Sequence, residues 1–154
     1  MRSPVTAYLA LGANLGDPIA TLTRAMDDIA AVASVTLRKR SALYRSAPLE
    51  SSGPDYINAV IEIETSLSAP ALLAALQHIE QLAGRERPSR NAPRTLDLDI
   101  LTYGDASVDS ATLVIPHPRL SQRAFVLLPL AEIAPHKVTA AQLQAVRSQV
   151  IERL

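Results

Sequence analysis

The sequence predicts an α+β fold with strands and helices in the order β-α-β-β-α-β, followed by a helical tail. Two segments, 18–32 and 68–84, carry apolar residues at the three- and four-residue spacing of an amphipathic helix. Strand-like apolar segments surround them, at 7–11, 35–44, 56–64 and 97–103. Four strands divided by two helices in this way form a split βαβ arrangement.

The first strand, 7–11, ends in a glycine-containing turn that leads into the first helix. We interpret Gly12 and Gly16 as turn glycines, because neither G-x-G-x-x-G nor a Gly-Lys-Ser/Thr ending follows the strand. Asp17 is a good N-cap and Pro18 suits the first helical position. The apolar stripe of this helix is Ile19, Leu22, Met26, Ile29 and Ala33.

The next two strands differ in pattern. Segment 35–44 is interrupted by three consecutive cations at 38–40, which alternation places on both faces, so we expect an exposed edge. Segment 56–64 alternates cleanly and places one set of apolar residues on a single face: Ile57, Ala59, Ile61 and Ile63. Ser68 then caps a helix that ends near Gly84.

After the fourth strand, Arg123–Ala131 is predicted as a helix and Thr139–Arg153 as a C-terminal helix. The whole is a ferredoxin-like βαββαβ sandwich with a C-terminal helical extension. Its two main helices cover one face of the sheet. The other face, which carries Asn58, Asp97 and Asp99, is expected to be available to ligands.

Composition limits the classes of protein that the chain can belong to. Its 154 residues suit one domain, 1–154, and 48% hydrophobic with 19% charged residues indicates a globular chain. No apolar run reaches the roughly 18 residues of a membrane span. Fifteen basic and fifteen acidic residues cancel, so no overall field attracts nucleic acid. Cysteine is absent, and we expect a cytoplasmic monomer without nucleic-acid or membrane partners.

The stretch from Gly84 to Tyr103 concentrates cations and anions. Four arginines within ten residues precede a strand in which Asp97 and Asp99 project to one face, since side chains alternate along a strand. Paired carboxylates repel unless a cation neutralises them, and Mg²⁺ prefers oxygen ligands. Arginine matches phosphate geometry. The stretch therefore favours a nucleotide phosphate bound through magnesium over a solvated loop beside an edge strand.

Several motifs then identify a family. The chain resembles the 6-hydroxymethyl-7,8-dihydropterin pyrophosphokinases of folate biosynthesis over about residues 7–134. The motifs that carry the resemblance are Asp55-Tyr-Ile-Asn58, Gly84-Arg-Glu-Arg87, the specific Pro93-Arg-Thr-Leu-Asp-Leu-Asp-Ile100, and Pro116-His-Pro-Arg119 followed by Arg123-Ala-Phe125.

The resemblance implies that ATP donates an intact pyrophosphate to the pterin's hydroxymethyl oxygen and leaves as AMP. It implies catalytic roles for Arg85, Arg94, Asp97 and Asp99, with both aspartates as ligands of two Mg²⁺ ions. The ATP-binding residues that it implies are Gln77, Glu80, Arg87, Ile100, His117, Arg119 and Arg123. Those implied for the pterin are Ser46, Ala47, Pro48, Leu49, Tyr56, Asn58 and Phe125.

Departures from the family pattern and two rival functions accompany this assignment. Asn91 stands where the best-known members have a tryptophan, and Ala47 replaces a proline. One rival is a single-stranded RNA-binding module, which would need aromatic platforms and a basic surface. The other is a non-catalytic ligand-binding regulatory domain, which leaves the convergence of aspartates and arginines unexplained.

Overall fold

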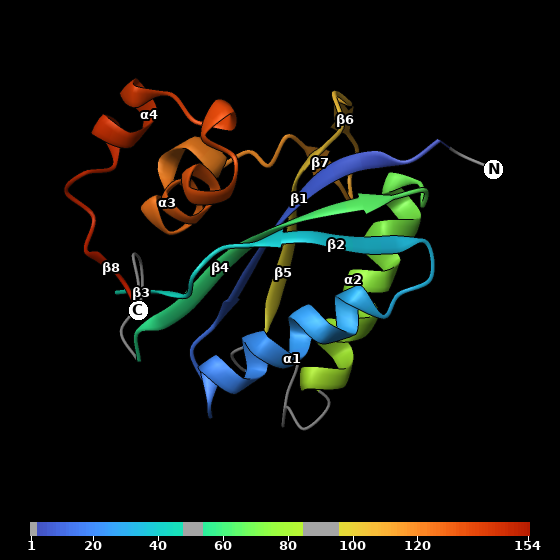
Figure 1. Ribbon diagram of the computed structural model, residues 1–154, viewed down its shortest axis with the longest axis horizontal. Coiled ribbons are helices and arrows are strands. Elements are labelled where there is room, and N and C mark those ends of the chain that lie inside the picture. Colours follow the sequence, from blue (N-terminus) through green and yellow to red (C-terminus); the bar gives the residue numbers. More distant parts are fainter. Residues whose placement is uncertain (1–2, 48–53, 85–95) are drawn as a thin grey trace.

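The computed structural model describes residues 3–47, 54–84 and 96–154 (Figure 1). Its elements follow in the order β1 (Val5–Ala13), α1 (Pro18–Ala30), β2 (Val35–Arg40), β3 (Tyr44–Ser46), β4 (Tyr56–Thr65), α2 (Ala69–Gly84), β5 (Asp97–Tyr103), β6 (Val108–Asp109), β7 (Val114–Ile115), η1 (Leu120–Gln122), α3 (Ala124–Ile133), η2 (Pro135–Lys137), α4 (Ala140–Ala145) and β8 (Ile151–Arg153).

The main sheet has the order β5-β1-β4-β3-β8, with β2 also paired to β4. Every pairing in it is antiparallel. The predicted strand at 35–44 is divided into β2 and β3, which pair with opposite ends of β4. The predicted α+β class and the βαββαβ order are confirmed, and β6 with β7 forms a separate two-stranded hairpin.

One face of the sheet packs on α1 and α2 and forms the larger core. The alternating residues predicted for β4 all lie in this core, together with Leu9 and Leu11 from β1 and Leu98 from β5. The helices contribute Leu22, Ile29, Leu72 and Leu76, each 1% exposed or less. Most of each predicted apolar stripe therefore faces the sheet. The exceptions lie toward the helix ends: Ile19 on the first turn of α1 is 44% exposed, Leu82 on the last turn of α2 is 51% exposed, and Ala33 is exposed beyond the end of α1.

The start of α1 follows the predicted local signals. Asp17 accepts a hydrogen bond from the backbone N–H of Ala20 through its carboxylate, at 3.2 Å, and Pro18 begins the helix. Gly16 has φ +63°, a conformation that glycine adopts without strain. Ser68 likewise accepts from the N–H of Ala71 at the start of α2.

The second face of the sheet is not fully open, contrary to the expectation. Helix α3 packs across it, and Tyr8, Val60 and Leu101 meet Val126 and Leu130 in a second core. In Figure 1, α1 and α2 lie on one side of the sheet and α3 on the other. Helix α3 is apolar except for Glu132, so it can contact the sheet and the C-terminal chain together. Only the part of this face beyond α3 is left for a ligand.

The predicted C-terminal helix from Thr139 to Arg153 is wrong. Helix α4 has the capping box of Thr139 and Gln142 but ends at residue 145. Val146 is 2% exposed in a small core with Ala124 and Leu127, and the chain then extends as β8. The physical reason is tertiary: β3 offers an open edge, and β8 satisfies its backbone groups by antiparallel pairing.

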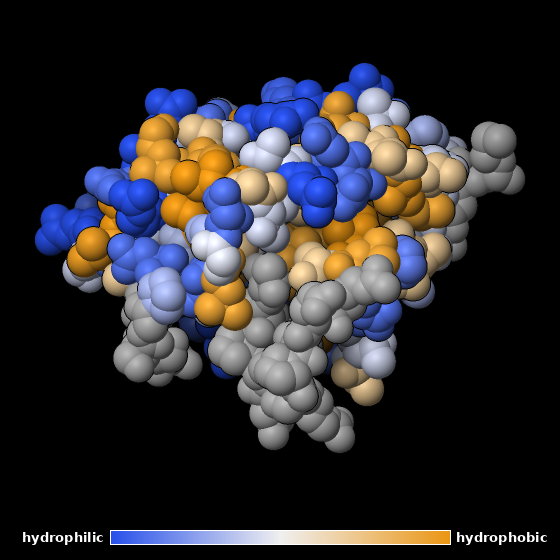
Figure 2. Space-filling view, turned by 90° about the horizontal axis from the view of Figure 1, so that it is seen from below, coloured by the Kyte–Doolittle hydropathy of each residue, from blue (hydrophilic) through white to orange (hydrophobic). Residues whose placement is uncertain are grey.

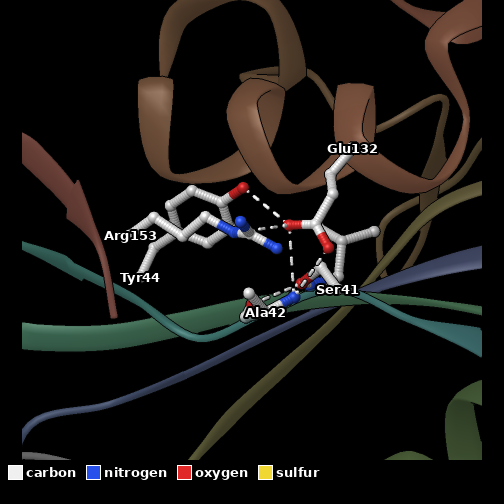
Figure 3. Close-up of polar contacts among 6 residues, drawn as sticks. Ser41, Ala42, Tyr44, Glu132 and Arg153 are labelled. Carbon is white, nitrogen blue, oxygen red and sulfur yellow. Dashed lines mark hydrogen bonds and ion pairs between the residues drawn. The ribbon is translucent and has the colours of Figure 1, made fainter.

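A polar cluster links α3 to the sheet near β3 and β8 (Figure 3). The Glu132 carboxylate of α3 accepts from Tyr44 Oη at 2.7 Å and from the Ala42 N–H at 3.0 Å, and the Arg153 Nε lies 3.6 Å away. Burial, reinforced by the hydrogen bond to Glu132, raises the pKa of Tyr44 to about 12. Three segments distant in sequence thus meet at one carboxylate.

Replacing Glu132 by alanine should lower the free energy of unfolding by about 1–3 kcal/mol, because the buried Tyr44 hydroxyl loses its acceptor. Urea unfolding measures this change. The matched control is Glu152→Ala, which removes an exposed pair with Arg45 and should cost about 0–1 kcal/mol. Equal losses for the two variants would contradict the structural role of the cluster.

Among the described residues, the exposed large apolar side chains lie on α1, on α2, on β7 and on either side of β8: Ile19, Leu82, Val114, Val150 and Leu154. Figure 2 shows hydrophilic and hydrophobic residues side by side on one face. Within the described ranges, no helix combines the length and the apolar character needed to cross a bilayer.

Candidate active site

A pocket of about 220 Å³ lies on the second face of the sheet, beside α3. It brings together ten residues that the sequence analysis assigned to a ligand site: Ser46, Ala47, Tyr56, Asn58, Asp97, Asp99, His117, Arg119, Arg123 and Phe125. They come from β3, β4, β5, the segment around η1, and α3. The fold thus gathers residues that are up to 79 positions apart, from 46 to 125.

The floor of the pocket is made by small residues of β1. Tyr8, Ala10 and Gly12 point to the same face, because they alternate with the core residues of the strand. Tyr8 is covered by α3, whereas Ala10 and Gly12 leave the space open. Gly12 is therefore not a turn glycine: it lies inside β1, opposite Asn58 and Asp97. A Cβ at this position would stand 3.4 Å from Asn58 Oδ1.

Asn58 is a fixed amide in the pocket. It is 3% exposed, and its Nδ2 donates to Ser46 Oγ at 2.7 Å across the β3–β4 pair. Ser46 is itself 5% exposed. A buried amide held in this way presents a defined donor and acceptor edge to a planar ligand.

Asp97 and Asp99 lie on the pocket face of β5, as the alternation predicted, while Leu98 and Ile100 lie in the core. The Asp99 side chain is 54% exposed, and its Oδ1 lies 4.0 Å from His117 Nε2. The two carboxylates occupy the edge strand of the sheet, next to β1. Their charge therefore faces the opening of the pocket rather than its apolar interior.

His117 is held against β5 by hydrogen bonds of its own. Its backbone N–H donates to the Leu101 carbonyl at 2.9 Å, and its Nδ1 accepts from the Arg119 N–H at 3.2 Å. In the neutral imidazole this leaves the proton on Nε2, the nitrogen on the Asp99 side. His117 is thus arranged as a hydrogen-bond donor toward an anionic ligand.

Arg123 and Phe125 form the α3 side of the pocket. The Arg123 guanidinium carbon lies 5.2 Å from the centre of the Phe125 ring, which is a cation–π contact. Arg123 has an extended backbone as the N-cap of α3, whereas Phe125 is already in the helix. A cation and an aromatic ring therefore meet at one wall of the site.

Three predicted ATP-binding residues lie outside this pocket. Gln77 is exposed on α2, and the side chain of Ile100 is 3% exposed in the larger core. The Glu80 carboxylate accepts from the backbone N–H of Leu98 at 2.8 Å. Glu80 therefore satisfies an N–H on the outer edge of β5. A contact of Ile100 with a nucleotide would have to be made by its backbone.

The remaining predicted residues lie outside the described part of the chain: Pro48, Leu49, Arg85, Arg87 and Arg94. Asn91 lies there as well. Their roles stay predictions.

The model of the family described as 7,8-dihydro-6-hydroxymethylpterin-pyrophosphokinase (HPPK) matches residues 8–135. The chain belongs to this family. The match covers both main helices, every residue that lines the pocket, and the main sheet except for β8 and the first residues of β1.

Curated relatives agree with this HPPK assignment. The 2-amino-4-hydroxy-6-hydroxymethyldihydropteridine pyrophosphokinases of Synechocystis sp. and Haemophilus influenzae are 46% and 47% identical, each over 84% of this chain. The chain spans 66% of the Synechocystis protein and 82% of the Haemophilus protein. The predicted family is confirmed. Membership of this family disfavours both rival functions.

Solved structures support the HPPK fold. The Plasmodium falciparum HPPK-DHPS triple mutant with SDX-DHP superposes with a TM-score of 0.69, at 15% identity, over 85% of this chain and 41% of its own. A substrate complex of HPPK-DHPS gives 0.65 over 95% of this chain and 43% of its own. At this identity the likeness shows the fold alone, and it confirms the ferredoxin-like class.

The donor set of the HPPK pocket suits Mg²⁺. Among the described residues there is no cluster of three or more His, Cys, Asp or Glu side chains that would hold a metal alone. Magnesium sites of phosphoryl-transfer enzymes commonly use one or two carboxylates and complete their shell with water and substrate phosphates. Asp97 and Asp99, on one face of β5 and lining one pocket, meet that requirement.

Sequence reasoning missed five residues that line the HPPK pocket: Ala10, Leu11, Gly12, Leu101 and Val126. The signal for the floor was present as two small residues, Ala10 and Gly12, two positions apart on one face of β1. Alternation along β5 puts Leu101 on the same face as Asp97 and Asp99. For Val126 no local signal exists, because it lines the pocket only through the packing of α3 on the sheet.

Proposed function

We propose that this chain transfers the terminal pyrophosphate of ATP to the hydroxymethyl group of 6-hydroxymethyl-7,8-dihydropterin. AMP and the pterin diphosphate are the products. The observation that carries the proposal is the placement of a buried amide, two carboxylates and a cation–π pair around one pocket. The buried amide suits the pterin, the two carboxylates suit the metal, and the cation of the cation–π pair suits the phosphates.

The pterin occupies the inner end of the pocket in this proposal. The Asn58 amide, fixed by Ser46, bonds to the polar edge of the heterocycle. Phe125 and Tyr56 offer rings against its faces. Burial of Asn58 and Ser46 excludes competing water, so recognition is by shape and by hydrogen bonds. Ala47, Pro48 and Leu49 would complete this side.

The ATP phosphates occupy the outer end. His117 donates from Nε2, and Arg119 and Arg123 supply cations, on the side where Asp99 faces the opening. These groups favour in-line attack of the pterin hydroxyl on the β-phosphorus, because they offset the charge that develops on the transferring group. Arg85, Arg87 and Arg94 are proposed to act on the same phosphates. Gln77, Glu80 and the Ile100 backbone would lie on the nucleoside side.

Two Mg²⁺ ions held by Asp97 and Asp99 are part of the proposal. When bound, they would neutralise phosphate charge. The carboxylates of Asp97 and Asp99 would bind the metal, while His117, Arg119 and Arg123 would orient the phosphates. Asp99 is also a candidate acceptor for the proton of the pterin hydroxyl.

The proposal is tested by AMP formation from ATP in the presence of the pterin. We expect AMP only when the pterin, ATP and Mg²⁺ are all present, and its formation should stop with excess EDTA and return with added Mg²⁺. ADP as the nucleotide product would show transfer of a single phosphate and contradict the proposal. Full activity in EDTA would contradict the metal assignment alone.

The expectations of one domain, of a monomer and of a cytoplasmic location stay predictions. Sedimentation of the purified chain tests the monomer, and cell fractionation tests the cytoplasmic location.

A further inference from the structure

Arg123 lies at an unusual junction for a residue that faces the pocket. It stands between η1 and α3 and has an extended backbone, with φ −131° and ψ 120°. As the N-cap of α3 it makes no side-chain cap, because a guanidinium has N–H donors but no acceptor for the N–H groups of the helix. The first N–H groups of a helix need partners from elsewhere. Something else must fix this backbone.

Gln149 supplies that partner from the C-terminal chain. Its Oε1 accepts from the Ala124 N–H at 2.9 Å, and its Nε2 donates to the Gln122 carbonyl at 2.8 Å. The two backbone groups flank Arg123 on either side. One side-chain amide therefore spans the residue with a donor and an acceptor, as a neighbouring strand would. Both bonds are short and cross 25 to 27 positions of sequence.

Gln149 is itself held in place on both sides. Its N–H donates to the Val146 carbonyl at 3.0 Å, and Val146 is buried against Ala124 and Leu127. Two residues further on, Ile151 pairs with Ser46 in the sheet. In Figure 1 the C-terminal chain runs beside α3 from α4 to β8. The contacts on both sides of Gln149 therefore hold its amide in place. A continuous helix over 139–153 would lack the pairing of Ile151 with Ser46.

We propose that Gln149 is a positioning residue for Arg123: its amide fixes the backbone at 122–124 so that the Arg123 guanidinium is directed into the phosphate end of the pocket. The inference rests on the proposed function for the identity of the ligand. Gln149 does not line the pocket, so it acts through Arg123. A displacement of about 1 Å at a phosphate contact is enough to weaken it strongly.

The experiment is a double-mutant cycle on the full chain. Gln149→Met keeps the length of the side chain and removes both hydrogen bonds. Titration calorimetry with a non-hydrolysable ATP analogue and Mg²⁺ should show a Kd raised about 5- to 20-fold. In an Arg123→Ala background the same substitution should change this Kd less than twofold, because coupled residues are not additive.

The matched control is Gln142→Met, in the same C-terminal segment. Gln142 accepts from the Thr139 N–H in the capping box of α4 and does not line the pocket. This variant should lower the unfolding temperature without changing the Kd for the ATP analogue by more than twofold. It separates general loosening of the C-terminal segment from positioning of Arg123.

Two results would overturn the inference in a wild-type protein that forms AMP. One is a Gln149→Met effect on the Kd no larger than that of the control. The other is an effect that persists undiminished in the Arg123→Ala background, which would show a structural role independent of the arginine. A wild-type protein that forms no AMP would instead overturn the proposed function, and the inference with it.

Discussion

Replacing Asp97 or Asp99 by asparagine should lower the rate of AMP formation by about 10³-fold, while the chain stays folded. Both side chains point away from the core and line the pocket, so neither substitution removes apolar packing. Asparagine keeps the size of the side chain and removes its charge. Under saturating Mg·ATP and pterin, AMP release measures the loss directly, and thermal unfolding checks the fold.

Asp105→Asn is the matched control for the aspartate variants. Asp105 is exposed in the turn that follows β5 and does not line the pocket. This variant should keep wild-type turnover. If Asp97→Asn and Asp99→Asn both keep turnover within tenfold of the wild type, the two carboxylates do not hold the metal.

Replacing Asn58 by leucine should raise the Kd for the hydroxymethyldihydropterin about 10²-fold, measured by calorimetry with an ATP analogue and Mg²⁺. Leucine is close in size to asparagine but offers neither donor nor acceptor to the pterin edge. Ser46 Oγ also loses its partner. Binding of the ATP analogue should change much less, because Asn58 lies at the inner end of the pocket in the proposed arrangement.

Thr65→Val tests whether such a loss reflects the pocket or only the strand. Thr65 is buried at the far end of the same strand, and its hydroxyl donates to the Ser34 carbonyl at 2.8 Å. This variant should lose stability but bind the pterin normally. Equal weakening of pterin binding in both variants would mean that Asn58 acts through the sheet and not by direct contact.

Much of the fold and site followed from local patterns. Asp17 and Pro18 start α1, and alternation along β4 separates the core residues from Asn58, because a strand turns successive side chains to opposite faces. The same rule placed Asp97 and Asp99 on one face. Local rules failed at Gly12, which looked like part of a turn but lies within a strand whose neighbours, β4 and β5, are distant in sequence.

The sequence by itself determined the βαββαβ order, the paired carboxylates and the family, because these depend on residue type and spacing along the chain. Only the tertiary structure decided three other features: the packing of α3 across the ligand face, the C-terminal chain as β8 in place of a helix, and Gln149 beside Arg123. Segment 139–153 has an acceptable helical pattern, but burial of Val146 and pairing at the open edge of β3 outweigh it. Such long-range contacts form the walls of the pocket. The chemical groups of the pocket could therefore be predicted from residue type and spacing, whereas its shape could not.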